Sequence, residues 1–242
     1  MSLASLPVEL LFEIQLSALS SALPYVNKFC YDAFSHAPVS LRIEYLARRH
    51  EQPHTISKAL LYPLCTPEIL QQLLNRPDNP ATVPPSLPRR FFRNLQDNSP
   101  PDGWKDDSFP LPLLRVLFNS GRTPNPDPNA HKALQYAVAA RFDQLVEFLL
   151  ARGADPKRSG ARAITIAIEQ KNLQRVRLLC ERRDQPKRGK KRKLEDRVDV
   201  DTEFLRLAVK RRAVDIAEYF VDKGVVPDMD TLRLLGGRSS IR

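Results

Sequence analysis

The sequence predicts an all-α protein, and three observations carry this prediction. Glycine is scarce, with 8 residues among 242, whereas leucine and alanine are frequent. No convincing alternation of apolar and polar residues extends beyond about four positions, so strands have no clear signal. The C-terminal half repeats a helix-length pattern of apolar side chains. The 21 prolines must then lie between helices or in their first turns.

The N-terminal block, residues 1–50, begins with the segment LPVELLFEIQLSAL at Leu6. Pro7 suits the first turn of a helix, and Glu9 in that turn suits the helix dipole. Apolar residues surround more than one side of this helix, so it either lies deep in a core or meets two surfaces. Two further helices are expected, near residues 23–34 and 41–49.

Targeting and membrane segments have no support in the sequence. No Lys or Arg precedes Lys28, and acidic residues interrupt the first apolar run, which excludes a signal peptide. No window reaches the roughly 18 apolar residues that a membrane-spanning helix needs. Cys30, Cys65 and Cys180 have no paired spacing, which fits a reducing compartment. We therefore expect a nuclear and/or cytoplasmic protein without a membrane partner.

The middle region, residues 51–128, is rich in proline. Residues 77–128 hold twelve of the 21 prolines and predict loops and short turns rather than long helices. Isolated apolar residues, Phe91, Phe92 and Trp104, indicate that these loops pack on other parts of the protein.

Residues 129–242 contain three related units. They align on Ala137, Ala167 and Ala208, and a large apolar residue follows twelve positions later in each unit, as Leu149, Leu179 and Phe220. Each unit predicts a short Ala-rich helix, a tight turn, a longer helix and a loop. Buried positions are expected at Ala133, Leu134, Ala137, Ala163, Ile164, Ala167, Leu205 and Ala208. No single unit can bury its apolar face, so the units are expected to stack.

Glycine marks the end of two of these units. Gly153 and Gly224 occupy equivalent positions, where a helix often ends in a left-handed residue, and Arg183 takes this position in the middle unit. The second and third units are 41 residues apart, because a basic segment is inserted between them.

This pattern resembles the ankyrin repeat. KALQYA from Lys132 keeps the Leu and Ala of the family's first-helix signature, and LLARGADP from Leu149 matches its second helix and loop. Shorter segments from Leu117 and from Glu68 are similar to the ends of earlier, degenerate repeats, and 230–235 would be a truncated cap. The resemblance implies a helical solenoid that holds a target protein on its first helices and loop tips. Its groove candidates are Gln135, Arg141, Thr165, Lys171, Arg206 and Arg212. Four of these six are basic, so we expect an acidic or phosphorylated target.

The N-terminal block resembles the F-box, a three-helix module. The opening LPVELLFEI matches the family's L-P-x-E-L-L-x-x-I pattern, and Val26 to Phe34 match its later segment; Ser17 and the lack of an acidic residue before Leu23 depart from it. The resemblance implies docking on a Skp-type adaptor and, through it, on a cullin. It implies an adaptor-binding surface at Leu6, Pro7, Glu9, Leu10, Leu11, Ile14 and Val26. The alternative is that these residues only pack on the first repeat.

The insertion RRDQPKRGKKRKLEDR, residues 182–197, carries a net charge of +6, whereas the whole chain carries +10. It resembles a nuclear localisation signal that an import receptor would bind, through Lys187, Arg188, Lys190, Lys191, Arg192 and Lys193. Two other interpretations stay open, a nucleic-acid contact and a solvated loop. Nucleic acid is the weaker of the three because no aromatic residue is interleaved for base stacking.

The sequence gives no sign of catalysis, and no cofactor is expected. It contains no phosphate-binding glycine loop, no G-x-S-x-G and no paired-cysteine zinc spacing. His50 and His54, with Cys30 and Cys65 nearby in the sequence, would be the best metal candidates, but Pro53 interrupts the helix that would align the histidines. No metal site is therefore predicted.

The expected organisation is an F-box-like module at 1–50, degenerate repeats with Pro-rich loops at 51–128, and ankyrin repeats at 129–242. The expected function is that of a substrate-recognition subunit in a cullin–RING ubiquitin ligase. The alternative is a nuclear ankyrin scaffold that never joins a ligase.

Overall fold

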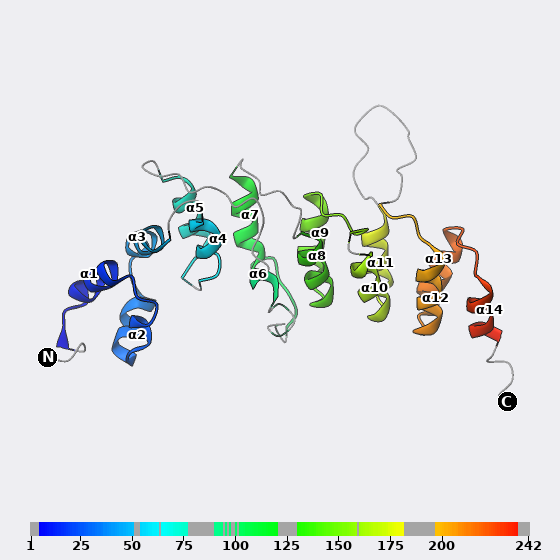
Figure 1. The fold of residues 1–242 in the computed structure, drawn as a ribbon, viewed down its shortest axis with the longest axis horizontal. Coiled ribbons are helices and arrows are strands. Elements are labelled where there is room, and N and C mark those ends of the chain that lie inside the picture. The colour runs from blue at the N-terminus through cyan, green and yellow to red at the C-terminus, as the bar shows by residue number, and fades with distance from the viewer. Residues whose placement is uncertain are drawn as a thin grey trace, which may run out of the picture. The chain divides into compact units, whose positions relative to one another are not determined.

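The computed structural model is helical throughout the part of the chain that it describes (Figure 1). Every regular element there is a helix and none is a strand, which confirms the predicted all-α class. No described helix is long and apolar enough to cross a membrane. The described residues are 5–50, 54–62, 64–76, 90–93, 95, 97, 100, 102–120, 130–158, 160–181 and 197–236.

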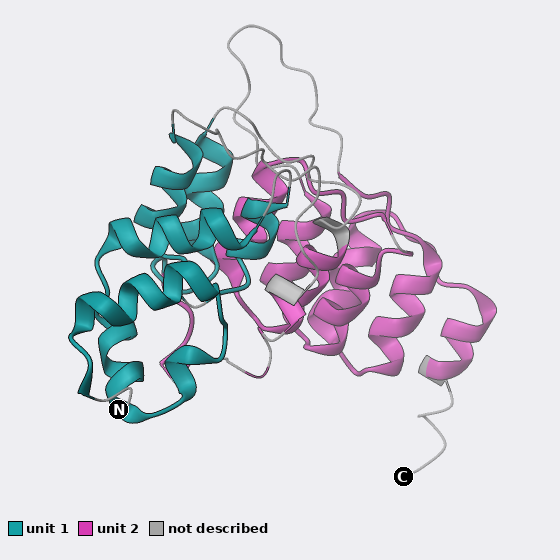
Figure 2. Ribbon diagram, turned by 60° about the vertical axis from the view of Figure 1, so that its left-hand side comes forward, with its two compact units in different colours: residues 1–91, 106–125 teal, residues 92–105, 126–242 magenta. Residues whose placement is uncertain are grey.

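The chain forms two compact units, shown in different colours in Figure 2. Unit 1 comprises residues 1–91 and 106–125, and unit 2 comprises residues 92–105 and 126–242. The border passes through the short helix α6, Arg90–Arg93. The boundaries predicted at residues 50 and 128 stay predictions.

Unit 1 is built from short helices joined by turns. Its elements are α1 Val8–Ala18, η2 Leu23–Tyr25, α2 Lys28–Ser35, α3 Val39–Arg49, α4 Thr55–Ala59, α5 Pro67–Leu74 and α7 Leu111–Asn119.

The second helix expected from the sequence, near residues 23–34, is two elements rather than one. Pro24 lies in the first turn of the 3₁₀ helix η2, which ends at Tyr25. Asn27 then starts α2 with extended backbone, and its side chain accepts a hydrogen bond from the Cys30 N–H at 2.7 Å. This cap satisfies an N–H that the new helix would otherwise leave unpaired, which is why the helix restarts there.

The first three helices enclose a small core. Leu11, Cys30 and Phe34 are buried together, and Leu6, Phe12 and Leu23 pack against them. The Phe12 and Phe34 rings lie 5.9 Å apart between their centroids. Tyr45 of α3 is buried, and its hydroxyl donates to the carbonyl of Ser20 at 3.2 Å. The N-terminal block therefore has a complete core of its own.

The remainder of unit 1 continues from α3 through α5 to α7, which pack in succession. Thr66 caps α5 and Pro67 occupies its first turn, as the sequence rules for helix starts predict. Glu44 of α3 accepts hydrogen bonds from Arg48 and from Arg76, both at 2.6 Å. These two arginines lower the pKa of Glu44, and Arg76 ties the end of α5 to α3.

Unit 2 is a stack of three helical hairpins followed by one more helix. Within it α8, α10 and α12 pack side by side, as do α9, α11 and α13, while α14 packs on α12. All eight residues predicted to be buried by the stacking of the three repeats are buried. The elements are α8 Ala130–Ala139, α9 Asp143–Ala151, α10 Arg162–Glu169, α11 Leu173–Cys180, α12 Thr202–Lys210, α13 Val214–Asp222 and α14 Met229–Gly236.

The hairpins share one turn geometry. In the first, the Phe142 N–H donates to the Ala137 carbonyl at 3.0 Å and the Arg141 N–H donates to the Val138 carbonyl at 3.1 Å. The other two hairpins repeat both bonds, from Asn172 to Ala167 and from Ala213 to Ala208, with their neighbours. This pattern is the Schellman motif, which requires one residue with positive φ.

Buried polar contacts join the first two hairpins. Arg175 of α11 is 4% exposed, and its guanidinium donates to both carboxylate oxygens of Asp143 in α9, at 2.6 and 3.0 Å. The same guanidinium donates to Gln170 at 2.5 Å. The Gln170 amide in turn donates to the carbonyls of Val138 and Ala139 at the end of α8. The contact therefore spans both layers of the stack.

Arg197 closes the base of the basic insertion. Its backbone N–H donates to the Cys180 carbonyl at 2.7 Å, and its guanidinium donates to the carbonyls of Glu181 and Leu150, each at 3.2 Å. A cation at helix C-termini is stabilised by the helix dipole. The chain thus leaves and returns at one place, beside the ends of α9 and α11.

Trp104 packs on the first hairpin. Its ring stacks on that of Phe142, with 4.5 Å between centroids and 5° between planes, and its indole N–H donates to the Ala140 carbonyl at 2.7 Å. Phe92 is also buried, at 1% exposed. These contacts confirm for both residues that the Pro-rich region packs on other parts of the protein. The side chain of Phe91 is outside the described residues.

Candidate functional site

Several large apolar side chains of the N-terminal module are exposed on α1, η2 and α2. Leu10 and Ile14 lie four residues apart on α1, so they share a face of the helix, and they are 44% and 37% exposed. A shallow hollow beside them is lined by Leu6, Leu10, Glu13, Ile14, Ser17 and Ala18. Four more large apolar side chains are exposed on η2, on α2 and in the short link between them, namely Tyr25, Val26, Phe29 and Tyr31.

The residues of the predicted adaptor-binding surface fall into two groups. Pro7, Glu9, Leu10, Ile14 and Val26 are exposed, and Leu6 is half-buried at the edge of the hollow. Leu11 differs, because it is 0% exposed and belongs to the core with Cys30 and Phe34. Its side chain stabilises the module and is not available at the surface. The expectation that Leu11 contacts a partner is corrected accordingly.

Sequence patterns missed the aromatic part of this surface. Tyr25 is 74% exposed and Tyr31 is 54% exposed. Exposed tyrosines are typical of protein interfaces, where their rings bury a large area at low entropic cost. Tyr31 directly follows buried Cys30 on α2 and therefore faces away from the core, but this could not be inferred while residues 23–34 were expected to form one helix.

The predicted groove residues separate into two places within unit 2. Gln135, Thr165 and Arg206 lie on the first helices of the three hairpins, and only Arg206 of these is exposed. Arg141, Lys171 and Arg212 lie instead in the turns that follow those helices, where all three are exposed. The structure therefore does not gather the six residues into a single groove.

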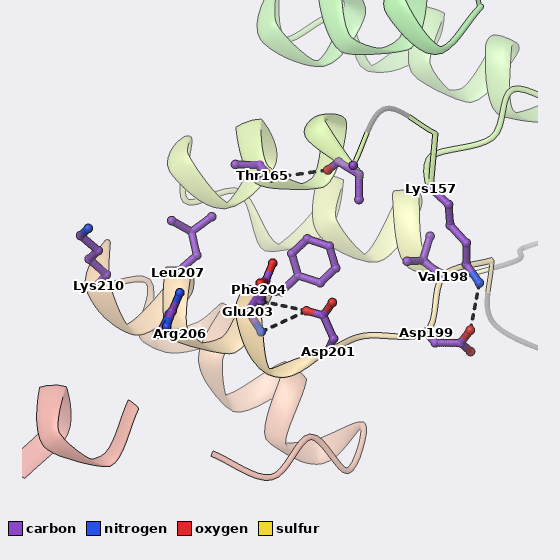
Figure 3. Close-up of a pocket in the computed structure, with 12 residues that line it drawn as sticks. Lys157, Thr165, Val198, Asp199, Asp201, Glu203, Phe204, Arg206, Leu207 and Lys210 are labelled. Carbon is purple, nitrogen blue, oxygen red and sulfur yellow. Dashed lines mark hydrogen bonds and ion pairs between the residues drawn. The ribbon is translucent and has the colours of Figure 1, made fainter. Parts of the chain in front are cut away.

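Thr165 and Arg206 line one hollow of about 640 Å³ between α10 and α12. Figure 3 shows the pair Lys157 and Asp199 on one side of it and Lys210 on the other. Lys157 donates to the Asp199 carboxylate at 2.9 Å and lowers the pKa of this exposed acid. Asp201 caps α12 by accepting from the N–H groups of Glu203 and Phe204.

The hollow is balanced in charge rather than basic. Its lining includes Lys157, Arg206 and Lys210, but also Asp199, Asp201 and Glu203. Sequence reasoning missed Asp199 and Asp201 because they lie in the loop between the basic insertion and α12, and it missed Glu203 because this residue lies in the first turn of α12, before the predicted groove positions. The basic character expected of the groove is found at the turns.

The residues of the predicted nuclear localisation signal, Lys187 to Lys193, lie outside the described residues. The same holds for Arg183. The structure describes only the points at which this segment leaves and rejoins the stack, at Glu181 and Arg197.

The cysteine and histidine candidates for a metal do not come together. Among the described residues, no three His, Cys, Asp or Glu side chains form a group that would hold an ion. Cys30 and Cys65 are buried, and burial raises the pKa of Cys65 to about 12, which disfavours the thiolate that a metal needs. His50 instead packs on the Tyr62 ring, with 5.4 Å between centroids.

Comparisons of the chain with models of known protein families, with curated proteins and with solved structures give no match.

Proposed function

We propose that this chain is a non-catalytic substrate receptor of a cullin–RING ubiquitin ligase. Its F-box-like module docks on a Skp-type adaptor, and its ankyrin-like stack holds a target protein. The exposed apolar surface on α1, η2 and α2 is the observation that carries the proposal.

The N-terminal module has two distinct sets of apolar side chains. One set, around Leu11, Cys30 and Phe34, already completes the core. The other set, which includes Leu10, Ile14 and Val26, remains exposed although burying such a side chain is worth about 1.5–3 kcal/mol. Leu10 and Ile14 lie together at the hollow on α1, and a small module that keeps several large apolar side chains exposed is typical of a protein that docks through them.

The stacked hairpins support the second half of the proposal. Helix–turn–helix units that stack through small buried residues present a continuous surface made by loops and first helices. Ala137, Ala167 and Ala208 lie on the first helices of the three hairpins and are each 0% exposed, so this chain can present such a surface. A receptor of this kind works by positioning its target and supplies no reacting group.

Adaptor binding by the full chain tests the proposal. Replacing Leu10, Ile14 and Val26 with Asp should abolish capture of a purified Skp-type adaptor, since even one anchor worth about 2 kcal/mol changes affinity roughly 30-fold. Leu11 is left unchanged so that the core stays intact. The matched control places Asp at Val214, Val226 and Met229, which are also exposed but lie in unit 2.

Wild-type and control proteins should bind the adaptor equally well. Binding by the triple variant within threefold of wild type would contradict the docking surface. A wild-type chain that binds no Skp-type adaptor would favour the alternative function, a nuclear scaffold that uses the hairpin stack without a ligase.

A further inference from the structure

Three basic residues occupy the same strained position in the three hairpins of unit 2. Arg141, Lys171 and Arg212 have φ values of +59°, +54° and +57°, in the left-handed region. Each is the residue that the Schellman turn requires to have positive φ, and glycine or asparagine adopts this conformation at lower cost. All three side chains are exposed, and none forms an ion pair with another described residue.

Glycine is the residue with positive φ at a second set of helix ends, where it adopts this conformation without strain. Gly153 and Gly224 close α9 and α13 with φ values of +92° and +90° and with the same hydrogen-bond pattern. A Cβ atom at either glycine would meet nothing within 4 Å, so it is the positive φ of the backbone, and not a lack of space, that favours glycine at these positions. The turns after the first helices carry a basic residue although they also require a positive φ. The basic side chains therefore have a use that glycine would not supply.

The three turns lie next to one another along one edge of the stack. The Gln170 amide, beside Lys171, donates to Val138 and Ala139 at the end of α8, which Arg141 follows. Arg211, beside Arg212, donates to Glu169 at the end of α10 at 2.7 Å. Packed helices are about 8–10 Å apart, so the backbone positions of the three turns are expected to follow one another at about that spacing. We call Arg141, Lys171 and Arg212 the basic row.

Acidic neighbours do not cancel the basic row. Asp143 is held by Arg175 and Glu169 by Arg211, so both carboxylates already have a cation. Asp215 in the first turn of α13 is exposed, but Lys210 adds a further cation near the third turn. The residues that directly follow the basic row are Phe142, Asn172 and Ala213, and Phe142 is buried under Trp104. Among the described residues at these turns, Trp104 is half-buried, and one face of its ring is already stacked on Phe142, which limits stacking on nucleic-acid bases.

We infer that the basic row binds an extended acidic segment of a protein partner, with one carboxylate at about every third residue. An extended chain in the polyproline II conformation has three residues per turn and advances about 3.1 Å per residue. Every third side chain then faces the same way at intervals of about 9 Å, which match the spacing between neighbouring turns. This inference deepens the proposed function, because it rests on the hairpin stack being the target-binding part. It assigns target recognition to the turns rather than to the hollow between α10 and α12.

The experiment measures binding of fluorescent synthetic peptides to the full chain without any adaptor. The probe has Glu at every third position between Gly and Ser, and the comparison peptide has the same composition with its Glu residues in one block. The spaced peptide should bind more tightly, and added salt should weaken it. Replacing all three residues of the basic row with Gly should weaken its binding roughly tenfold or more.

A matched control removes the same charge from the second helices. Arg152 directly follows α9 and lies over the Phe148 ring. Arg177 of α11 and Lys223, which directly follows α13, lie over the Tyr219 ring. Their replacement by Gln should leave peptide binding within twofold. Equal losses in both triple variants would overturn the inference, because they would show only a dependence on net charge. Tighter binding of a single-stranded DNA oligomer that the Gly variant also loses would overturn it in favour of nucleic acid.

Thermal unfolding separates this role from a purely structural one. Cations near a helix C-terminus also interact favourably with the helix dipole, so a purely structural role predicts that Gly replacement lowers the melting temperature. We expect the Gly variant to melt at the wild-type temperature or above it, because the strain is removed. A lower melting temperature together with unchanged peptide binding would overturn the inference. Adaptor capture by the Gly variant should equal wild type, so failure of the basic row is distinguishable from failure of the docking surface.

Discussion

His50 shows how one side chain couples the fold to pH. Its Nε2 atom is buried and has no hydrogen-bond partner among the described residues. Burial lowers the pKa of His50 below its ordinary value of 6.5, and the charges of Arg49 and Lys58 lower it further. The folded protein therefore resists a proton that the unfolded chain accepts.

This asymmetry predicts a loss of stability on mild acidification. Because the unfolded state binds more protons as pH falls through about 6.5, the free energy of unfolding decreases there. The variant His50→Gln should lose less stability than wild type between about pH 7.5 and pH 5.5. Urea unfolding at several pH values measures this, with His54→Gln as the control that should behave as wild type. Parallel pH profiles for wild type and His50→Gln would contradict the prediction.

At the scale of the elements, Arg175 is the main polar contact between two hairpins. Its guanidinium is buried, whereas the Asp143 side chain is 52% exposed. The two partners therefore differ in their access to water. Without its partner the acid can still be solvated, whereas the cation cannot. Removing the acid leaves a buried cation uncompensated, and removing the cation leaves an acid that water can reach.

We expect Asp143→Ala to lower the free energy of unfolding by about 1–3 kcal/mol. Arg175→Met should cost less, because it keeps the apolar volume and removes the buried charge. Urea denaturation of both variants, with equal slopes in denaturant, gives the comparison. The reverse order of the two losses would show that the ion pair itself, and not the burial of the cation, dominates.

Sequence patterns predicted the elements better than the contacts between them. The small residues of the first helices had to be buried for the hairpins to stack, and Gly153 had to end a helix, because both follow from local geometry. The roles of Arg175 and Arg197 could not be predicted, since their partners lie in other hairpins. The exposed side of α1 was foreseen, but Leu11 was assigned to it, because a broad apolar surface does not reveal which residues face the core.

For the whole molecule, the basic insertion is separable from the hairpin stack. Arg197 holds the point of return against Cys180, Glu181 and Leu150, so the stack is continuous on both sides of the insertion. Neighbouring hairpins also pack through α10 with α12 and through α11 with α13. The segment 182–196 is thus expected to act independently of the fold.

Replacing residues 182–196 with a short Gly-Ser linker tests whether this segment is dispensable for the fold and whether it is the nuclear import signal. The melting temperature should change by no more than about 2 °C, since a shorter loop and fewer surface charges alter stability by fractions of a kcal/mol. A fluorescently tagged protein should shift from the nucleus to the cytoplasm if this segment is the import signal. Arg197→Ala serves as the control, because it should lower the melting temperature and leave import unchanged. A nuclear signal that persists without the segment would contradict the localisation proposal.

The closure at Arg197 also means that an unbroken backbone is not needed at this position. A single peptide cut within 182–196 would leave two polypeptides, one ending after α11 and one beginning at α12. These pieces would still share the packing of α10 on α12 and of α11 on α13, and the hydrogen bonds from Arg197 to the end of α11. The third hairpin with α14 can therefore be supplied as a separate chain. In this sense the protein contains a natural point at which it can be split and reassembled.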